Sequence, residues 1–197
     1  MSGDRLSGMR WDVRAFDLFA PVYDLFMYSA DETAIRKGLA VADRDVDRIV
    51  EVGGGSGRVA RAIGATVVDP AAGMVRRARG RGLEAIRGSA TDLPHPDGSV
   101  DAVVVVDAFH HFPEQERCLE EMARVLALGG VLIVTEFDRG CRRGRALDAV
   151  EGLVGFDSTF YTAAELEAAI GATGLDVRPI EYGFETTIAG VKPATGV

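Results

Sequence analysis

The chain has few cysteines and few histidines. Its 197 residues include only two cysteines, Cys118 and Cys141, which fall in a predicted helix and a predicted loop. Two cysteines this far apart are too few for a disulfide framework or a cysteine-based metal site. His110 and His111 are adjacent, but no third ligand accompanies them at a suitable spacing, so we expect no metal centre.

The sequence also lacks a long hydrophobic run and an excess of basic residues. No apolar stretch is long enough to cross a bilayer, and the N-terminus is polar and contains acids, unlike a secretory signal peptide. The formal net charge is −8, and a surface of that sign repels the phosphates of nucleic acids. We therefore expect a cytoplasmic protein with no membrane span and no nucleic-acid partner. The sequence does not indicate an oligomeric state.

Lysine is scarce, and four of the arginines form a local cluster. Four arginines lie close together in the sequence: Arg139, Arg142, Arg143 and Arg145. Such a cluster either binds an anionic group of a substrate or forms a solvated helix face, and both interpretations stay open.

Length and composition indicate a single domain. The chain is 47% hydrophobic, enough for 197 residues to bury a full core, and no linker-like segment interrupts it. We expect one domain over 1–197.

The most informative segment is a glycine-rich turn at 53–57. An apolar run ends in Glu51, four glycines follow, and helix-compatible residues resume at Arg58, which together predict a strand, a tight turn and a helix start. Arg58 stands where a dinucleotide fingerprint requires its third glycine, and the lysine of a phosphate-binding loop is absent. The turn is therefore predicted to hold another small polar ligand, unless it is only a tight turn.

The spacing of Glu51, Gly53, Gly55 and Gly57 resembles the first motif of the class I S-adenosylmethionine-dependent methyltransferases. The resemblance implies that the loop passes under the amino-acid end of S-adenosylmethionine. It also implies that Glu51 fixes the loop and the ammonium group of the ligand.

A second match follows at the next predicted strand, 65–69. Asp69 ends this strand, where a carboxylate can accept both ribose hydroxyls of a nucleoside ligand, although such a residue also serves as a helix N-cap. The stretch from Pro70 to Arg79 resembles the family segment in which a methionine lies near the adenine. Met74 is that methionine here, or else an ordinary helix-packing residue.

A third match covers 88–101, which resembles the passage of these enzymes that contacts the adenine. The match places Ser89 and Ala90 at the cofactor, and it departs from the family because Ser89 replaces an aspartate. We expect weaker adenine recognition, or help from Asp92. His95 replaces the usual phenylalanine and is predicted to be a surface turn residue.

The run 102–106 is an alanine followed by four β-branched valines, which predicts a central strand buried on both faces. Ligands of open α/β sheets bind at the carboxyl ends of their strands, so Asp107, His110 and His111 fall at the mouth of the predicted cleft. Asp107 is assigned to the cofactor. In the simpler interpretation, His110 packs beside the cofactor and His111 hydrogen-bonds the loop.

The rest of the chain completes the pattern of an α/β fold. A helix over 113–126, a strand over 131–137 ending near Glu136, and a helix capped by Thr162 and Glu165 are predicted. Two alternating runs, 176–182 and 184–191, then predict an antiparallel pair. The fold class is a doubly wound, mostly parallel seven-stranded sheet, the Rossmann-like methyltransferase fold, with an antiparallel C-terminal strand pair.

The segment 14–26 resembles the N-terminal flap of small-molecule members, which include quinone and phospholipid methyltransferases. The resemblance implies a helical N-terminal flap over 1–45 and a core over 46–192. Its apolar residues recur at helical spacing and must cover an apolar surface. In the family, the tyrosine that Tyr23 matches lies near the methionyl carboxylate of the cofactor. The alternative is an extra helix packed on the core.

The resemblance implies methyl transfer from S-adenosylmethionine to a small-molecule acceptor by in-line displacement. Such a reaction depends mainly on positioning, and it needs a general base only if the acceptor must lose a proton. The candidates for that base are His110, then His111, then Glu136. A non-catalytic S-adenosylmethionine-binding protein and, less favoured, a nicotinamide-dependent oxidoreductase are the alternatives.

Overall fold

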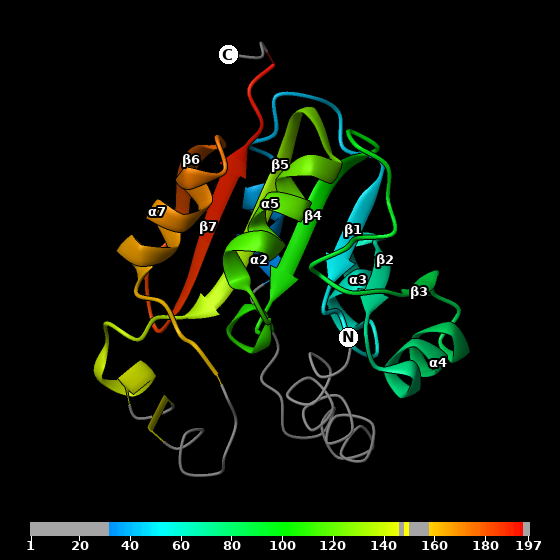
Figure 1. The fold of residues 1–197 in the computed structure, drawn as a ribbon, viewed down its shortest axis with the longest axis horizontal. Helices are drawn as coiled ribbons and strands as arrows, with labels where there is room; N and C mark the ends of the chain where they lie inside the picture. Colours follow the sequence, from blue (N-terminus) through cyan, green and yellow to red (C-terminus); the bar gives the residue numbers. More distant parts are fainter. Residues whose placement is uncertain (1–31, 146–147, 150–157, 195–197) are drawn as a thin grey trace, which may run out of the picture.

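The computed structural model describes residues 32–145, 148–149 and 158–194 (Figure 1). These residues form a seven-stranded sheet of order β3-β2-β1-β4-β5-β7-β6. The strands are β1 (Ile49–Val52), β2 (Thr66–Asp69), β3 (Ala85–Arg87), β4 (Val100–Val106), β5 (Leu126–Phe137), β6 (Asp176–Glu181) and β7 (Glu185–Val191). The helices are α2 (Glu32–Leu39), α3 (Arg58–Ile63), α4 (Ala72–Gly80), the 3-10 turn η1 (Phe109–His111), α5 (Gln115–Val125) and α7 (Ala163–Ala172).

The sheet has a parallel part and an antiparallel part. Strands β3, β2, β1, β4 and β5 pair in parallel, whereas β7 pairs antiparallel with both β5 and β6. The predicted fold class is confirmed, including the antiparallel C-terminal pair. The predicted division into flap and core stays a prediction, because residues 1–31 lie outside the described part of the chain.

The central strand β4 is buried on both faces, as its β-branched sequence predicts. Val103 and Val105 join one hydrophobic cluster, and Ala102 and Val104 join a second cluster on the opposite face. This alternation follows from the two-residue period of a strand. Because β4 has a core on each side, polar side chains are confined to its ends, and its carboxyl end is where ligands of open α/β sheets bind.

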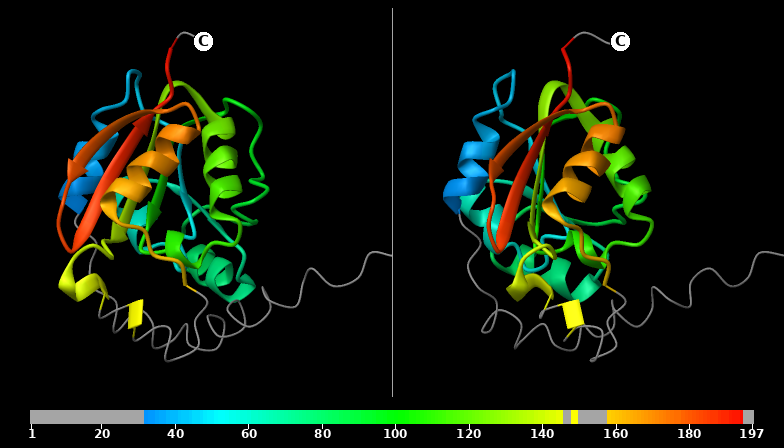
Figure 2. Two further views of the ribbon diagram at one scale, coloured as in Figure 1. Left: turned by 60° about the vertical axis from the view of Figure 1, so that its left-hand side comes forward. Right: turned by 90° about the vertical axis from the view of Figure 1, so that its left-hand side faces the viewer.

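Helices cover both faces of the sheet (Figure 2). Leu119 of α5 and Leu166 of α7 are buried in the first cluster, and Ile35 of α2 is buried in the second together with residues of α3 and α4. The start of α7 has the predicted capping box, with reciprocal hydrogen bonds between Thr162 and Glu165. The three-layer arrangement fixes the ends of the strands, from which the candidate site is built.

Strand β5 begins earlier than the sequence predicts. The sequence predicts a strand over 131–137, but β5 starts at Leu126, directly after α5 ends at Val125. The register jumps from Leu126 opposite Val100 to Val131 opposite Ala102, so the extra residues form an irregularity within the strand. Gly129 adopts a φ of 76° there, a left-handed conformation that favours glycine, and β5 continues beyond it.

The order of the strands in the sheet reverses at β1, which lies between β2 and β4. In open α/β sheets, ligands bind at such a switch point, outside the carboxyl ends of the strands. Figure 1 shows these ends at the lower edge of the view, where the arrows of β4 and β5 point. The candidate site residues follow these strand ends.

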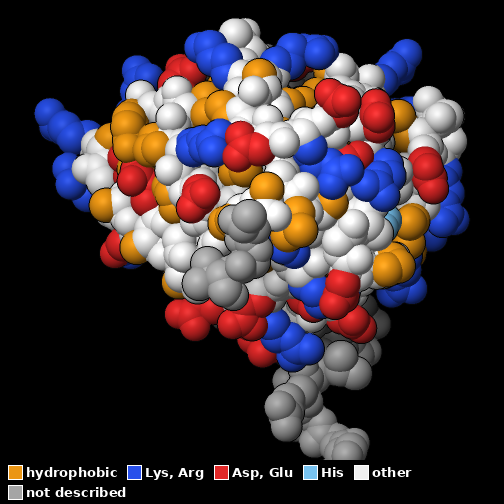
Figure 3. Space-filling model, turned by 90° about the horizontal axis from the view of Figure 1, so that it is seen from above, with side chains coloured by type: hydrophobic (Ala, Val, Ile, Leu, Met, Phe, Trp, Pro, Cys, Tyr) orange, Lys and Arg blue, Asp and Glu red, His pale blue; other side chains and the backbone are white. Residues whose placement is uncertain are grey.

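The opposite end of the sheet has a structural role. Asp101 at the start of β4 accepts hydrogen bonds from the main chain and guanidinium of Arg48 and forms an ion pair with Arg44. These contacts hold the Asp101 pKa well below its usual range, chiefly through the Arg48 hydrogen bond. Figure 3 shows this end with acidic and basic side chains interspersed.

No helix among the described residues is long and apolar enough to cross a membrane.

Candidate active site at the carboxyl ends of β1, β2, β4 and β5

The glycine loop between β1 and α3 requires its glycines. Gly53, Gly55 and Gly57 have φ angles of 73°, 55° and 81°, in the left-handed region that favours glycine. A Cβ added to Gly53 would lie 2.9 Å from the Cβ of Ala108, and one added to Gly57 would overlap Leu83. The main chain of the loop therefore packs closely against its surroundings, and no side chain separates it from a ligand.

Two buried carboxylates contact this loop and the helix that follows it. Oε2 of Glu51 accepts a hydrogen bond from the main-chain N–H of Ala60 (2.8 Å). Oδ2 of Asp69 accepts from Gly55 (2.9 Å), and Oδ1 accepts from Ala71 (2.8 Å). Asp69 thus connects the glycine loop to the start of α4. Burial raises the pKa of Glu51 to about 8. The predicted contact of Asp69 with the ribose stays a prediction.

The residues predicted to contact the adenine lie beside this loop. Met74 is buried in α4, with its sulfur 3.8 Å from the position of a Cβ on Gly55. Ser89 hydrogen-bonds the hydroxyl of Thr91 (2.8 Å), Ala90 is buried, and Pro70 is exposed after β2. Their cofactor contacts stay predictions.

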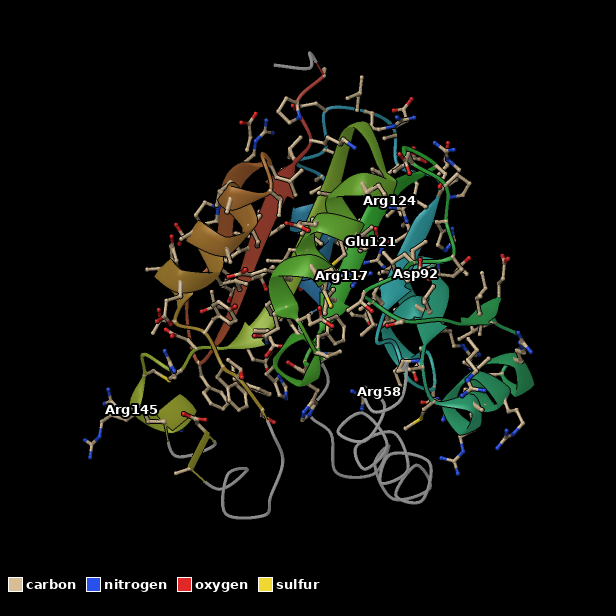
Figure 4. All side chains as sticks on the ribbon, in the orientation of Figure 1. Arg58, Asp92, Arg117, Glu121, Arg124 and Arg145 are labelled. Carbon is tan, nitrogen blue, oxygen red and sulfur yellow. The ribbon has the colours of Figure 1, made fainter. Side chains whose placement is uncertain are left out.

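The segment after Ala90 is attached to helix α5. Oε2 of Glu121 accepts the main-chain N–H of Leu93 (2.9 Å), and Arg124 donates to the carbonyl of His95 (3.0 Å) and to Asp97 (2.7 Å). Figure 4 shows Glu121 and Arg124 projecting from α5 beside this segment. His95, predicted at the surface, is half-buried, and burial lowers its pKa.

Asp107 follows the last residue of β4. It has a φ of 49°, which is uncommon for a residue other than glycine, and its side chain is only 7% exposed. Its Oδ1 is buried without a hydrogen-bond partner among the described residues. Burial raises the pKa of Asp107 to about 7, and the negative charges of Glu136 and Glu185 add to this effect.

His110 and Glu136 form a buried pair. Nδ1 of His110 lies 2.7 Å from Oε2 of Glu136, and Oε1 of Glu136 accepts the main-chain N–H groups of Phe109 (2.6 Å) and His110 (3.3 Å). An ionised carboxylate only accepts hydrogen bonds, so the proton of this contact belongs to Nδ1. The ring stacks on Phe160 at a centroid distance of 4.4 Å. The ring of His111 lies beside that of His110 at a centroid distance of 4.0 Å, so the structure brings together all three predicted base candidates.

His111 has a different environment. Its Nδ1 lies 3.1 Å from Oγ of Ser158, which places it in contact with the segment before α7. Burial lowers the pKa of His111 to about 3, and the neighbouring His110 adds to this effect. The ring therefore stays neutral near pH 7.

The remaining predicted residues are less informative. Arg139 forms an ion pair with Glu165 at the start of α7 (3.0 Å), whereas Arg142, Arg143 and Arg145 are exposed. Figure 4 places Arg145 well apart from Arg58, which starts the helix after the glycine loop. Tyr23 lies outside the described residues, so its cofactor role stays a prediction. The cytoplasmic location and the lack of a nucleic-acid partner also stay predictions.

Sequence reasoning missed the residues that hold the histidine pair in place. Nε2 of Gln115 donates to the carbonyls of Phe109 (2.8 Å) and Thr159 (3.0 Å), and the N–H of Thr159 donates to the carbonyl of His110 (2.9 Å). Together with the Phe160 ring, these contacts join segments that are far apart in the sequence. Neither motif nor spacing indicates such contacts.

Comparisons with known proteins agree with this geometry. A family described as "Methyltransferase domain" matches residues 50–134. The chain is 39% identical over 140 residues to a demethylmenaquinone methyltransferase of Thermus thermophilus, a match that covers 62% of this chain and 64% of the relative. It is 32% identical over 156 residues to a phosphatidylethanolamine N-methyltransferase of Cereibacter sphaeroides, which covers 71% and 77% of the two chains.

A solved structure from Thermotoga maritima, described as an S-adenosylmethionine-dependent methyltransferase and possible histamine N-methyltransferase, matches with a TM-score of 0.79. Its sequence identity is 27%, and the match covers 92% of this chain and 99% of the other.

The length of the match differs among the relatives. The chain spans 64% of the Thermus relative, and 39% and 54% of two further curated relatives. The Cereibacter relative is matched over more than two thirds of its length at more than 30% identity. From the glycine loop, the strand order and these matches together, the chain belongs to the family of S-adenosylmethionine-dependent methyltransferases.

Proposed function

We propose that this protein transfers a methyl group from S-adenosylmethionine to a small-molecule acceptor. The observation that carries the proposal is the left-handed glycine loop at the switch point of the sheet, held by the buried carboxylates of Glu51 and Asp69. Bare main chain at the end of β1 gives a small ligand close access, and Asp69 at the end of β2 is a carboxylate of the kind that accepts ribose hydroxyls. These residues fit the adenosyl and amino-acid parts of the cofactor.

The proposed cofactor contacts follow the strand ends. Gly53, Gly55 and Gly57 lie under the amino-acid end, Glu51 orients the loop, and Asp69 accepts the ribose hydroxyls. Ser89, Ala90, Met74 and Pro70 surround the adenine, and Tyr23 lies near the methionyl carboxylate. When bound, the cofactor supplies a methyl group already activated by its positive sulfur.

The residues of the chain then have three tasks: to bind, to orient and to exclude water. Holding the acceptor in line with the methyl group contributes about 7 to 11 kcal/mol to lowering the barrier. We propose His110 as the base that accepts a proton from the acceptor. Glu136 keeps the proton of the ring on Nδ1, so Nε2 is the basic nitrogen, and Phe160 fixes the plane of the ring. A base of this kind contributes about 10² to 10⁴-fold.

Glu136 is a positioning residue in this proposal rather than a base. Its two oxygens are engaged by Nδ1 of His110 and by the N–H groups of Phe109 and His110. His111 is also disfavoured as the base, because a ring with a pKa of about 3 takes up protons poorly near pH 7. Of the three base candidates predicted from the sequence, His110 therefore stays the first choice.

The relatives support a small-molecule acceptor. One is named for demethylmenaquinone and another for the nitrogen of phosphatidylethanolamine. These names give two different acceptor atoms, so they support the class of acceptor and leave the methylated atom open.

The test has two steps. Calorimetry first measures binding of S-adenosylmethionine and S-adenosylhomocysteine, with NAD as the comparison ligand. Transfer of a labelled methyl group to pooled metabolites follows, with the wild type and His110→Gln. We expect binding of both sulfur compounds, none of NAD, and transfer that falls at least 100-fold in His110→Gln. Cofactor binding without transfer to any pool would favour the non-catalytic alternative, and stabilisation by NAD alone would favour an oxidoreductase.

A further inference from the structure

Asp107 has a buried carboxylate oxygen that no described residue satisfies. Asp107 is 7% exposed, and its Oδ1 has no hydrogen-bond partner in the part of the chain that the structure describes. Buried polar atoms in folded proteins are nearly always hydrogen-bonded, because an unsatisfied one loses its hydration without compensation. The oxygen therefore points to a donor that is supplied by a ligand.

The charges around Asp107 indicate which kind of donor fits. Glu136 from β5 and Glu185 from β7 add negative potential at this carboxylate, and His110 from η1 and Arg58 from α3 oppose it. Burial and the two acids together raise the pKa of Asp107 to about 7. A neutral donor would leave this repulsion in place. An alkylammonium group relieves it, since it brings N–H donors and a positive charge.

The position of Asp107 relates this donor to the chemistry. The next residue, Ala108, packs against Gly53, with its Cβ 2.9 Å from where a Cβ on Gly53 would lie. Three residues further on is His110, whose ring is held by Glu136. An ammonium group bound by Asp107 would therefore lie between the glycine loop and the proposed base, where an acceptor must meet the methyl group.

We propose that the methyl acceptor is an amine, whose ammonium group binds the carboxylate of Asp107. This inference rests on the proposed function and names its substrate class. The ammonium first gives one proton to Nε2 of His110. The nitrogen lone pair then forms the new bond to the methyl carbon, while the electron pair of the carbon–sulfur bond leaves with the sulfur. The products are an N-methylammonium and S-adenosylhomocysteine.

From the sequence, Asp107 is assigned to the cofactor, which carries an ammonium group of its own at its amino-acid end. This ammonium is the second source of the same chemistry. The Asp107→Asn variant distinguishes the two sources. Asparagine keeps the size of the side chain and tolerates the left-handed φ, but it removes the charge. Asp176→Asn, at an exposed position at the start of β6, is the control for loss of one negative charge.

Calorimetry with S-adenosylhomocysteine forms the first arm. If Asp107 binds the acceptor, the Kd of S-adenosylhomocysteine stays within about twofold of wild type in both variants. An affinity that falls tenfold or more in Asp107→Asn alone would assign this carboxylate to the cofactor ammonium and overturn the inference. Binding by the wild type keeps the proposed function intact in either case.

The second arm compares amines with neutral counterparts. Thermal shifts of the protein saturated with S-adenosylhomocysteine, and labelled methyl transfer, are measured with 2-phenylethylamine, hexylamine and ethanolamine and with the matching alcohols. We expect shifts and labelling with amines only, and a KM for the amine that rises about 10- to 100-fold in Asp107→Asn. Labelling of alcohols, phenols or quinones in place of amines, or no response to any amine, would overturn the inference.

Discussion

The carboxylate of Glu136 lies 2.7 Å from Nδ1 of His110, and both side chains are almost fully buried. The two residues come from different elements, the end of β5 and the turn after β4. The contact fixes which ring nitrogen carries the proton, and thereby which nitrogen can accept one. It is the relationship on which the proposed chemistry of the site depends.

Replacing Glu136 by glutamine is expected to reverse the tautomer of His110. The amide oxygen can still accept the N–H groups of Phe109 and His110, but the amide NH₂ then faces Nδ1 and donates to it. Nε2 would carry the proton and lose its basicity. We expect turnover to fall about 10² to 10⁴-fold with unchanged affinity for S-adenosylhomocysteine. Glu120→Gln, exposed on α5, is the matched control, and equal turnover in both variants would contradict the assignment.

Asp69 provides a test of the loop attachment. Its oxygens accept the N–H groups of Gly55 and Ala71 at 2.9 Å and 2.8 Å. Asparagine retains one acceptor and loses the charge, and hydrogen bonds to charged groups contribute about 1.5–3 kcal/mol each. We expect the Kd of S-adenosylhomocysteine to rise about 10- to 100-fold in Asp69→Asn, measured by calorimetry. If the affinity matches that of the exposed control Asp176→Asn, the role of Asp69 is excluded.

Gly57 and Gly82 separate two reasons for a glycine. Their φ angles are 81° and 80°, but only an added Cβ at Gly57 would overlap another side chain, that of Leu83. An alanine in the left-handed region costs about 1–2 kcal/mol, and overpacking adds about 1–3 kcal/mol. Gly57→Ala should therefore lower the free energy of unfolding by about 2–5 kcal/mol, and Gly82→Ala by about 1–2 kcal/mol. Urea denaturation measures both, and equal losses would refute the packing argument.

The raised pKa of Asp107 makes stability depend on pH. Between the ordinary pKa of 3.8 and about 7, the folded protein keeps a proton on Asp107 that the unfolded chain has lost. The folded state then binds more protons, so this group makes stability fall as the pH rises through that range. His111 acts in the opposite direction, since with a folded pKa of about 3 it makes stability fall as the pH drops below 6.5.

Asp107→Asn isolates the first contribution. The variant should be close to wild type in stability at pH 4 and become more stable than wild type by up to about 4 kcal/mol as the pH approaches 8. Thermal melts of the two proteins across this range measure the difference. A constant difference from pH 4 to pH 8 would mean that Asp107 titrates alike in the folded and unfolded chains.

Features that depend on neighbouring residues could be predicted from the sequence. The glycines of the loop, the run of valines in β4 and the capping box at Thr162 each follow from local backbone sterics or periodicity. The pairing of the last two strands also follows from their alternation. The start of β5 was misplaced, because Gly129 in a left-handed conformation fits an irregular strand as well as a helix end.

The arrangement of the site could be predicted only in part. Motif order placed Asp69, Asp107 and His110 at the same edge of the sheet, as strand direction in a parallel sheet requires. It did not indicate that Glu136 orients His110, or that Phe160 stacks on its ring, because these contacts join residues 26 and 50 positions apart. Such pairings depend on how the layers pack, which a single sequence does not record.

Binding of S-adenosylhomocysteine to the purified protein tests the central claim most directly. Calorimetry should show saturable binding with a Kd of about 100 µM or tighter, together with a rise in melting temperature. The same titration with Asp69→Asn should give clearly weaker binding. The absence of both heat and thermal shift with the wild-type protein would contradict the assignment of the glycine loop, and with it the account of the whole site.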